Sequence, residues 1–170
     1  MNFSRKELIQ SDATMNQMRN AIYELARIME RNGVSELNNR LRRMGQDIGK
    51  TFFKHWKAID VVNLTNLKDV LTTIYQKILN SSISIEIDET KNLIKVRDTN
   101  CALCKYHYDD IEIAGCEIVI GMVSEIISSI NKESPESFSF SIEPVEILES
   151  RAYGDKVCIQ LYKYKIGGRT

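Results

Sequence analysis

The sequence lacks a long apolar run, an excess of charge of either sign, and a recognisable leader. Its 23 basic and 23 acidic side chains balance, so no net field draws the chain to nucleic acid or to an anionic membrane. No window approaches the roughly 18 consecutive apolar residues of a membrane span, and the N-terminus lacks the apolar stretch of a secretory signal. We therefore expect a cytoplasmic protein with no nucleic-acid partner and no integral membrane association.

Catalytic signatures are also missing. The chain has only two histidines, His55 and His107, and it contains no Gly-x-x-x-x-Gly-Lys, no Gly-x-Ser-x-Gly and no His-Glu-x-x-His motif. His55 lies near the end of an expected helix, where a polar or positive side chain eases the helix dipole. The acidic pair Asp109 and Asp110 is typical of a solvated loop. Since no catalytic constellation can be assembled, we expect a protein that is not an enzyme.

What the sequence does contain is an ordinary globular composition, with 43% hydrophobic and 27% charged residues in a chain of 170. This length fits one domain around a single hydrophobic core. Apolar residues recur at steps of three and four over 12–31, 35–56 and 63–79, and each segment predicts an amphipathic helix. We expect an N-terminal helix within 1–33 and the main domain over 34–166, together forming one folding unit.

The period of the apolar pattern then changes to two. Residues 82–88 alternate apolar and polar side chains as a half-buried strand does, and 93–98 predict the return strand of a hairpin. Residues 116–130 are apolar on nearly every side and predict a central helix. Two more strands are expected at 138–150, bent at its proline, and at 157–165. Because helices and strands are segregated along the chain, we expect an α+β fold with an antiparallel sheet of about four strands packed on helices.

Two glycines, Gly45 and Gly49, lie one turn apart inside the second expected helix. Each costs about 1 kcal/mol relative to alanine in a helix interior, so the pair needs a compensating reason. We expect the close approach of another backbone, either within the domain or across a dimer interface, and a frayed or kinked helix is the alternative. One face of this helix is predicted to carry the apolar residues Leu37, Leu41, Met44, Ile48, Phe52 and Trp56, next to the two glycines.

The segment 37–56 around these glycines, with its Met-Gly-x-x-Ile-Gly core, resembles a long helix of the TRAPP core subunits. Segment 63–79 followed by a strand matches the order of elements in that family. The C-terminal half is more similar to the related 4-vinyl-reductase-type domain of bacteria and archaea. That domain shows a Cys-x-x-Cys-like pair, a cysteine followed five residues on by glycine, and Gly-Asp-x-x-Cys near its end. The matching residues here are Cys101 and Cys104, Cys116 with Gly121, and Gly154, Asp155 and Cys158.

This resemblance implies an α/β plait with helices on one side and dimerisation through helices, as a homodimer or a related heterodimer. It also implies a pocket for a small hydrophobic ligand, because relatives enclose an acyl chain or an aromatic effector. TRAPP subunits carry an acylated cysteine just before the third helix, where this chain has Val61 or its neighbours, so we expect no covalent acyl chain. Aromatic residues at helical spacing are also typical of an ordinary hydrophobic core without a ligand pocket. The expected lining is Phe52, Phe53, Trp56, Ile74, Ile120 and Val123.

The four cysteines admit three interpretations, and without an export signal we expect none of them to form disulfides. Cys101 and Cys104 have the spacing that turns two sulfurs toward one ion, and Cys116 and Cys158 would complete a Cys₄ zinc site. The resemblance carries zinc ligation onto the first three, with His107 as an alternative fourth ligand. In the second interpretation the cysteines are small apolar core residues. A redox pair is the third, but the charged residues that follow Cys104 fit a thioredoxin-like junction poorly.

Two functional hypotheses follow from these observations. The first is a non-catalytic domain that binds a small hydrophobic ligand and acts as a sensor or adaptor, braced by zinc if the cysteines hold it. The alternative is a TRAPP-like dimeric scaffold subunit for protein–protein interaction in vesicle tethering or GTPase regulation. An apolar pocket with room for a ligand favours the first. A solid core with an exposed apolar stripe on Met15, Met18, Ile22 or the Gly45/Gly49 helix favours the second.

Overall fold

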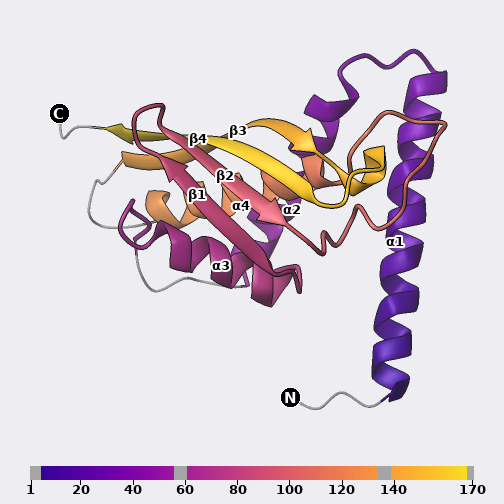
Figure 1. Cartoon of the computed structure of the whole chain (residues 1–170), viewed down its shortest axis with the longest axis horizontal. Coiled ribbons are helices and arrows are strands. Elements are labelled where there is room, and N and C mark those ends of the chain that lie inside the picture. Colours follow the sequence, from indigo (N-terminus) through magenta and orange to yellow (C-terminus); the bar gives the residue numbers. More distant parts are fainter. Residues whose placement is uncertain (1–4, 56–60, 134–138, 168–170) are drawn as a thin grey trace.

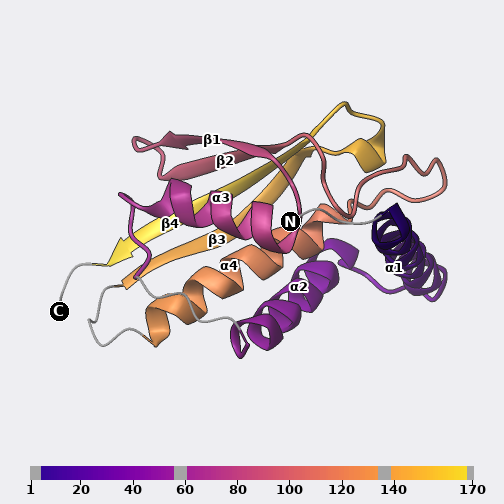
Figure 2. The same cartoon turned by 90° about the horizontal axis from the view of Figure 1, so that it is seen from below.

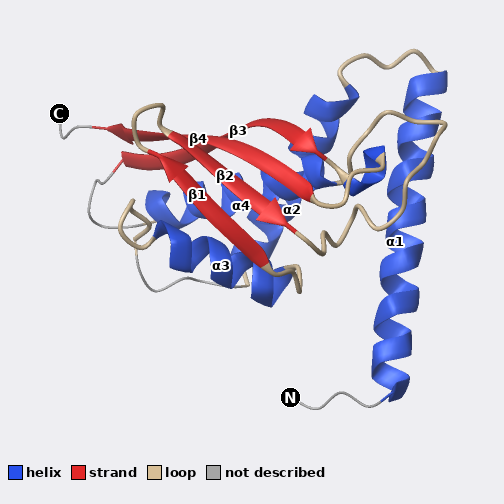
Figure 3. Cartoon of the chain, viewed as in Figure 1, coloured by secondary structure: helices blue, strands red, loops and turns tan. Residues whose placement is uncertain are grey.

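The protein forms an α+β fold in which a four-stranded antiparallel sheet packs on helices, as expected (Figure 3). The computed structural model describes residues 5–55, 61–133 and 139–167. Within these residues, no helix is both long and apolar enough to cross a membrane. The elements are α1 (Arg5–Arg31), α2 (Leu37–Phe53), α3 (Leu67–Ile78), β1 (Ile83–Asp88), β2 (Leu93–Asp98), α4 (Cys116–Lys132), β3 (Ser139–Glu149), the 3₁₀ helix η1 (Arg151–Tyr153) and β4 (Cys158–Gly167).

The sheet has the strand order β1-β2-β4-β3, with every neighbouring pair antiparallel. The register of β3 on β4 shifts between Pro144 and Glu146, which is the expected bend, because proline cannot donate to the ladder. Helices α3 and α4 lie on one face of the sheet, and α2 lies on the far side of α4 (Figure 2). The core therefore sits between the sheet and α4, whose side chains are buried on nearly every side as the sequence predicts.

Helices α2 and α4 pack backbone against backbone at their glycines. A Cβ added at Gly45 would overlap the carbonyl oxygen of Ile118, and one at Gly49 would lie 2.8 Å from that of Met122. The contact is reciprocal, because a Cβ at Gly121 would overlap the carbonyl oxygen of Arg42. The close approach expected for Gly45 and Gly49 is thus a contact within the chain, and Gly121 is its counterpart on α4.

The boundaries of the first three helices differ from those expected. Helix α1 begins at Arg5, seven residues before the predicted start at 12, because the intervening residues are mostly good helix formers. Helix α3 begins at Leu67 and not at 63. The side chain of Asn63 accepts hydrogen bonds from the backbone N–H of Asn66, and that of Asn66 accepts from the backbone N–H of Asn63. These bonds make a turn that competes with the helix.

Helix α1 stands beside one end of the sheet, and its N-terminal part extends away from the other elements (Figure 1). It is followed by Gly33, whose φ of 69° is in the left-handed region. The N–H of Val34 donates to the carbonyl of Met29 over 3.0 Å, which closes the helix end. The expected division into an N-terminal helix (1–33) and a domain (34–166) stays a prediction.

One buried ion pair joins the two helices that carry the glycines. Glu117, in the first turn of α4, is 2% exposed, and its carboxylate accepts from Arg42 Nε at 2.5 Å. Burial raises the pKa of Glu117, and the Arg42 guanidinium opposes that rise.

Replacing Arg42 with alanine is expected to lower the free energy of unfolding by about 3–5 kcal/mol, because it leaves a buried carboxylate without its counter-ion. Urea denaturation followed by circular dichroism measures the change. The double substitution Arg42→Met with Glu117→Leu is expected to recover most of the loss, since no unpaired charge remains. A double variant as unstable as Arg42→Ala would contradict the desolvation argument.

Candidate metal centre

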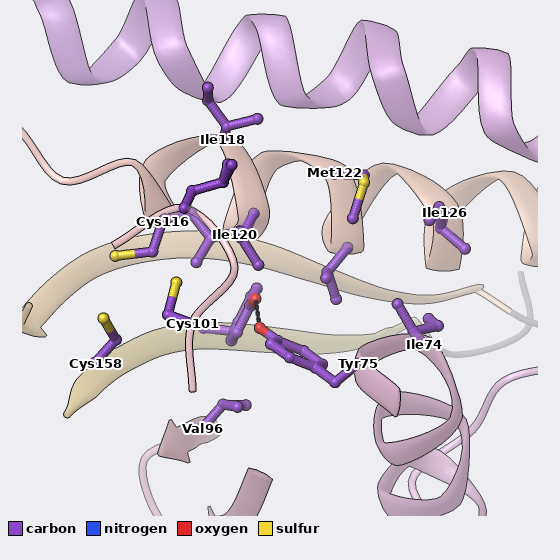
Figure 4. Packing of buried hydrophobic residues seen from close by; sticks show 14 of the residues in the cluster. Ile74, Tyr75, Val96, Cys101, Cys116, Ile118, Ile120, Met122, Ile126 and Cys158 are labelled. Carbon is purple, nitrogen blue, oxygen red and sulfur yellow. Dashed lines mark hydrogen bonds between the residues drawn. The ribbon is translucent and has the colours of Figure 1, made fainter. Parts of the chain in front are cut away.

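Four cysteines from three segments of the chain meet at one end of the sheet. Cys101 and Cys104 lie between β2 and α4, Cys116 is the first residue of α4, and Cys158 is the first residue of β4. Their four Sγ atoms all lie within 4.8 Å of one another, and all four residues are buried. Figure 4 shows the sulfurs of Cys101, Cys116 and Cys158 turned toward one another. The structure therefore brings together the complete set of cysteines proposed as ligands.

The geometry of the cluster fits a tetrahedral ion held by thiolates. A Zn–S bond of about 2.3 Å places the sulfurs of a tetrahedral site about 3.8 Å apart, within the 4.8 Å limit of this cluster. Backbone N–H groups already donate to two of the sulfurs, from Cys116 to Cys104 Sγ at 3.2 Å and from Arg151 to Cys158 Sγ at 3.4 Å. Such bonds favour the charged thiolate. The donor set suits zinc, or iron held by four sulfurs, and not magnesium or calcium.

The thiols influence one another's protonation. Burial alone would raise the pKa of Cys104, but hydrogen bonds from Cys101 and the other two thiols hold it well below its ordinary value. The hydrogen bond between Cys101 and Cys104 raises the pKa of Cys101. The hydrogen bond between Cys116 and Cys101 raises the pKa of Cys116. A hydrogen bond with Cys101 lowers the pKa of Cys158. Two sulfurs are therefore favoured as thiolates, and a bound metal ion would displace the protons of the other two.

The turn before β4 explains the Gly-Asp-x-x-Cys spacing. Gly154 has a φ of 94°, which favours glycine, and the Asp155 carboxylate accepts from the Ser150 N–H at 2.9 Å. This turn holds the Ser150 hydroxyl 3.8 Å from the sulfurs of both Cys116 and Cys158. A hydroxyl shared by two candidate ligands orients them in the way that outer-shell groups of metal sites do.

His107, the alternative fourth ligand, lies outside the sulfur cluster. Its Nδ1 is 2.7 Å from the carbonyl oxygen of Ala152, and its Nε2 is 2.7 Å from the Asp109 carboxylate. The residue is exposed. Both ring nitrogens thus have partners other than the site, and Cys158 is the fourth member of the sulfur cluster.

Three of the six residues proposed to line a ligand pocket pack closely in the core of the described structure. A cavity that admits even a water molecule would leave accessible surface on the side chains around it, whereas Ile74, Ile120 and Val123 are 0% exposed. Phe53 is also buried in the core, and Trp56 lies outside the described residues. A ligand at this place would have to separate these side chains, and the pocket stays a prediction.

Phe52 lies instead on the outer face of α2, beside an open groove of about 900 Å³. Met44, Ile48 and Phe52 lie along this face of α2, where Ile48 is 41% exposed and the other two are half-buried. The buried face of α2 is rotated toward its glycines, where a short distance between helix backbones gives the tighter packing. The groove is lined by Arg40, Arg43, Met44, Asp47, Ile48, Thr51, Phe52 and His55.

Sequence reasoning also missed two polar features next to the cysteines. The hydroxyl of Tyr23, on α1, approaches Cys104 Sγ at 3.9 Å and accepts from the Gly115 N–H at 3.1 Å. In the core, the Tyr75 hydroxyl lies 2.7 Å from that of Tyr162 and donates to Gln160. A glutamine at an inward position of β4 is the only signal that the sequence offers for the second feature.

Comparison with known proteins identifies the fold. No protein-family model and no curated protein matches the chain. Among solved structures, a trafficking protein particle complex subunit 3 from Naegleria fowleri, covalently bound to palmitic acid, is similar with a TM-score of 0.62 and 11% sequence identity. The match covers 91% of this chain and 96% of that one. The chain thus shares the fold of a TRAPP subunit, whereas the likeness to 4-vinyl-reductase-type domains stays a prediction.

Proposed function

We propose that the chain is a non-catalytic interaction subunit of the TRAPP type, which assembles through α1 and α2 with a second copy or a related chain and is braced by zinc in its four-cysteine centre. The observation that carries the proposal is the row of exposed apolar side chains on these two helices. Three large ones on one face of α1, namely Met18, Leu25 and Ile28, are between 41% and 50% exposed.

The exposed apolar side chains on α1 and α2 form contiguous faces and are not scattered singly over the surface. On α1, Met18, Leu25 and Ile28 recur with the helical period and are joined by the half-buried Ile22. On α2, Ile48 is flanked by Met44 and Phe52 along the open groove. Contiguous apolar patches on a surface mark sites of interaction, and α2 already covers α4 with its opposite face.

The fold supports an assembling role. The similar solved structure is, by its description, a subunit of a complex, and the resemblance of segment 37–56 to TRAPP helices implies dimerisation through helices. The fully buried Ile74, Ile120 and Val123 match the solid core that favours a scaffold. The cytoplasmic location and a part in vesicle tethering or GTPase regulation follow only from the resemblance and remain predictions.

Ligand binding is the weaker alternative. The similar structure holds palmitic acid covalently, but all four cysteines of this chain are in the sulfur cluster, so none is at Val61 to carry an acyl chain. A non-covalent ligand would have to open the core. Native mass spectrometry of the gently purified protein tests this alternative, which a reproducible co-purified lipid or aromatic molecule would support.

Light scattering during size-exclusion chromatography tests the assembly. We expect a mass of about twice the 19.6 kDa of one chain, and a fall to one-chain mass for Leu25→Glu on α1 or Ile48→Glu on α2. A charge at the centre of an apolar interface has no partner when buried, while these exposed positions leave the fold intact.

Leu148→Glu on β3 is the matched control. Its side chain is 49% exposed and lies on the sheet rather than on α1 or α2, so the dimer should persist. A monomeric wild-type chain, or a dimer that only Leu148→Glu dissociates, would contradict the proposed surface.

A further inference from the structure

We infer that metal binding at the four cysteines fixes the position of α1, so that metal occupancy controls how the chain presents the apolar face of this helix. The connecting element is residues 99–115, here called the cysteine loop. The inference rests on the metal centre and the assembly surface proposed above, and it adds a means of regulating them.

Helix α1 contacts the cysteine loop at the Cys-x-x-Cys turn itself. Arg19 Nε donates to the carbonyl oxygen of Ala102 over 2.6 Å, and Ala102 lies between the two ligand cysteines of the loop. The Tyr23 hydroxyl lies between Cys104 Sγ and the Gly115 N–H, at 3.9 and 3.1 Å. Both Arg19 and Tyr23 are buried, and the contacts of Tyr23 are shielded from water, whereas that of Arg19 is partly buried. Tyr23 therefore links α1 directly to a sulfur of the centre.

A second group of contacts holds the outer part of the loop. Arg27 donates two hydrogen bonds to the Asp110 carboxylate, at 2.6 and 2.9 Å. Its guanidinium lies over the ring of Tyr108, 5.2 Å from the centroid, and Tyr108 stacks on Tyr23 at 4.2 Å. The Tyr106 hydroxyl donates to Asn16 over 3.3 Å. The loop thus follows α1 for about three turns of the helix.

The cysteine loop has little regular structure of its own to keep this shape. Residues 99–115 form neither helix nor strand, so the loop is fixed by the burial of its apolar side chains and its two cysteines. A metal ion would tie Cys101 and Cys104 to Cys116 on α4 and Cys158 on β4. Such a cross-link restricts the loop far more than four neutral thiols in contact, because metal ligation at cysteine contributes directly to folding free energy.

Helix α2, helix α4 and the sheet pack chiefly against one another and not against α1. Helix α4 is held between α2 and the sheet by the glycine contacts and the core side chains, and α1 stands to one side (Figure 1). Loss of the ion should therefore release the loop and α1 as one local unit while the rest stays folded. Coupling between two sites is reciprocal, so weakening the grip of α1 on the loop should also speed the release of the metal.

Hydrogen exchange with mass spectrometry, applied to the full chain before and after removal of metal with a strong chelator, tests the coupling. We expect exchange to rise at least about 10-fold in α1 and in 101–115, and to change less than about twofold in α2 and α4. Metal content is measured on the same samples. Unchanged exchange in α1 after confirmed metal loss overturns the inference, as does an equal rise in α1 and α4.

The reciprocal test measures zinc release to a coloured chelator. Tyr23→Phe removes one hydroxyl beside a ligand and should speed release about 10-fold, the lower end of effects seen for groups that support metal ligands. Arg27→Ala should also speed release, although it touches no ligand. Tyr164→Phe, at another buried tyrosine, and Arg43→Ala, on the outer face of α2, are the matched controls. Release rates equal to wild type in both test variants overturn the inference.

The outcomes separate this inference from the proposals on which it rests. A purified protein without any bound metal overturns the metal centre and this inference together. A zinc protein in which hydrogen exchange of α1 does not change on metal removal overturns the inference alone. A zinc protein that is monomeric, yet shows metal-dependent exchange in α1, supports the coupling and contradicts only the proposed dimer.

Discussion

Replacing Cys104 with alanine is expected to abolish metal binding and to lower the free energy of unfolding by about 4 kcal/mol or more, because loss of a structural metal ranks among the largest single-residue effects. Cys104 receives the N–H of Cys116 and lies beside Tyr23, so its sulfur is the best supported of the four as a thiolate. Elemental analysis should find about one zinc per wild-type chain and almost none in the variant. Urea denaturation measures the loss of stability.

His107→Ala is the control that decides the fourth ligand. The His107 ring is bound to Ala152 and Asp109, so this variant should keep its zinc, whereas Cys158→Ala should lose it. A variant at Cys158 that retains full metal, together with loss in His107→Ala, would contradict the Cys₄ assignment. A metal-free and stably folded wild-type protein would show that the cysteines are core thiols.

The second large effect is expected at the contact between α2 and α4. Gly45→Ala should destabilise the protein by about 3 kcal/mol or more, since the new methyl group must displace the backbone of Ile118. In an ordinary helix interior the same change stabilises by about 1 kcal/mol, so the sign of the effect is itself informative. Gly121→Ala should behave alike, because its Cβ would meet the backbone of Arg42.

Asn38→Ala provides the comparison for helix propensity. Asn38 is exposed on α2, so alanine there should raise the midpoint of thermal unfolding slightly. A Gly45→Ala protein as stable as Asn38→Ala would show that the two helices are further apart than the structure places them. Unchanged oligomeric mass in Gly45→Ala is expected, because this contact lies within one chain.

Much of the fold could be read from local patterns. The alternation of Ile83, Ile85 and Ile87 predicts β1, and the structure confirms that strand and its hairpin with β2. The all-round apolar character of 116–130 predicts a helix buried on every side, which is α4. These patterns succeed because the period of burial follows directly from backbone geometry. The predicted start of α3 was less accurate because it depends on the side-chain hydrogen bonds of a competing turn. The predicted start of α1 was less accurate because it depends on helix propensity.

The candidate site was predictable in composition but not in arrangement. The Cys-x-x-Cys spacing predicts that the sulfurs of Cys101 and Cys104 can share one ion. The order of the motifs shared with 4-vinyl-reductase-type domains indicates Cys116 and Cys158 as the further cysteines. Nothing in the linear sequence decides between Cys158 and His107. That choice depends on the turn before β4, which brings Cys158 to the cluster, and on the partners that hold the His107 ring elsewhere.

The sequence by itself determined which segments become helices and strands, that the sheet is antiparallel, and which four residues can act as soft metal ligands. Only the tertiary structure decided which face of α2 is buried, since an apolar row and a glycine row compete and the closeness of α4 favours the glycines. It also decided where α1 rests. That position depends on Arg19, Tyr23 and Arg27 meeting a loop more than 70 residues away, and contacts between such distant segments arise only when the chain has folded.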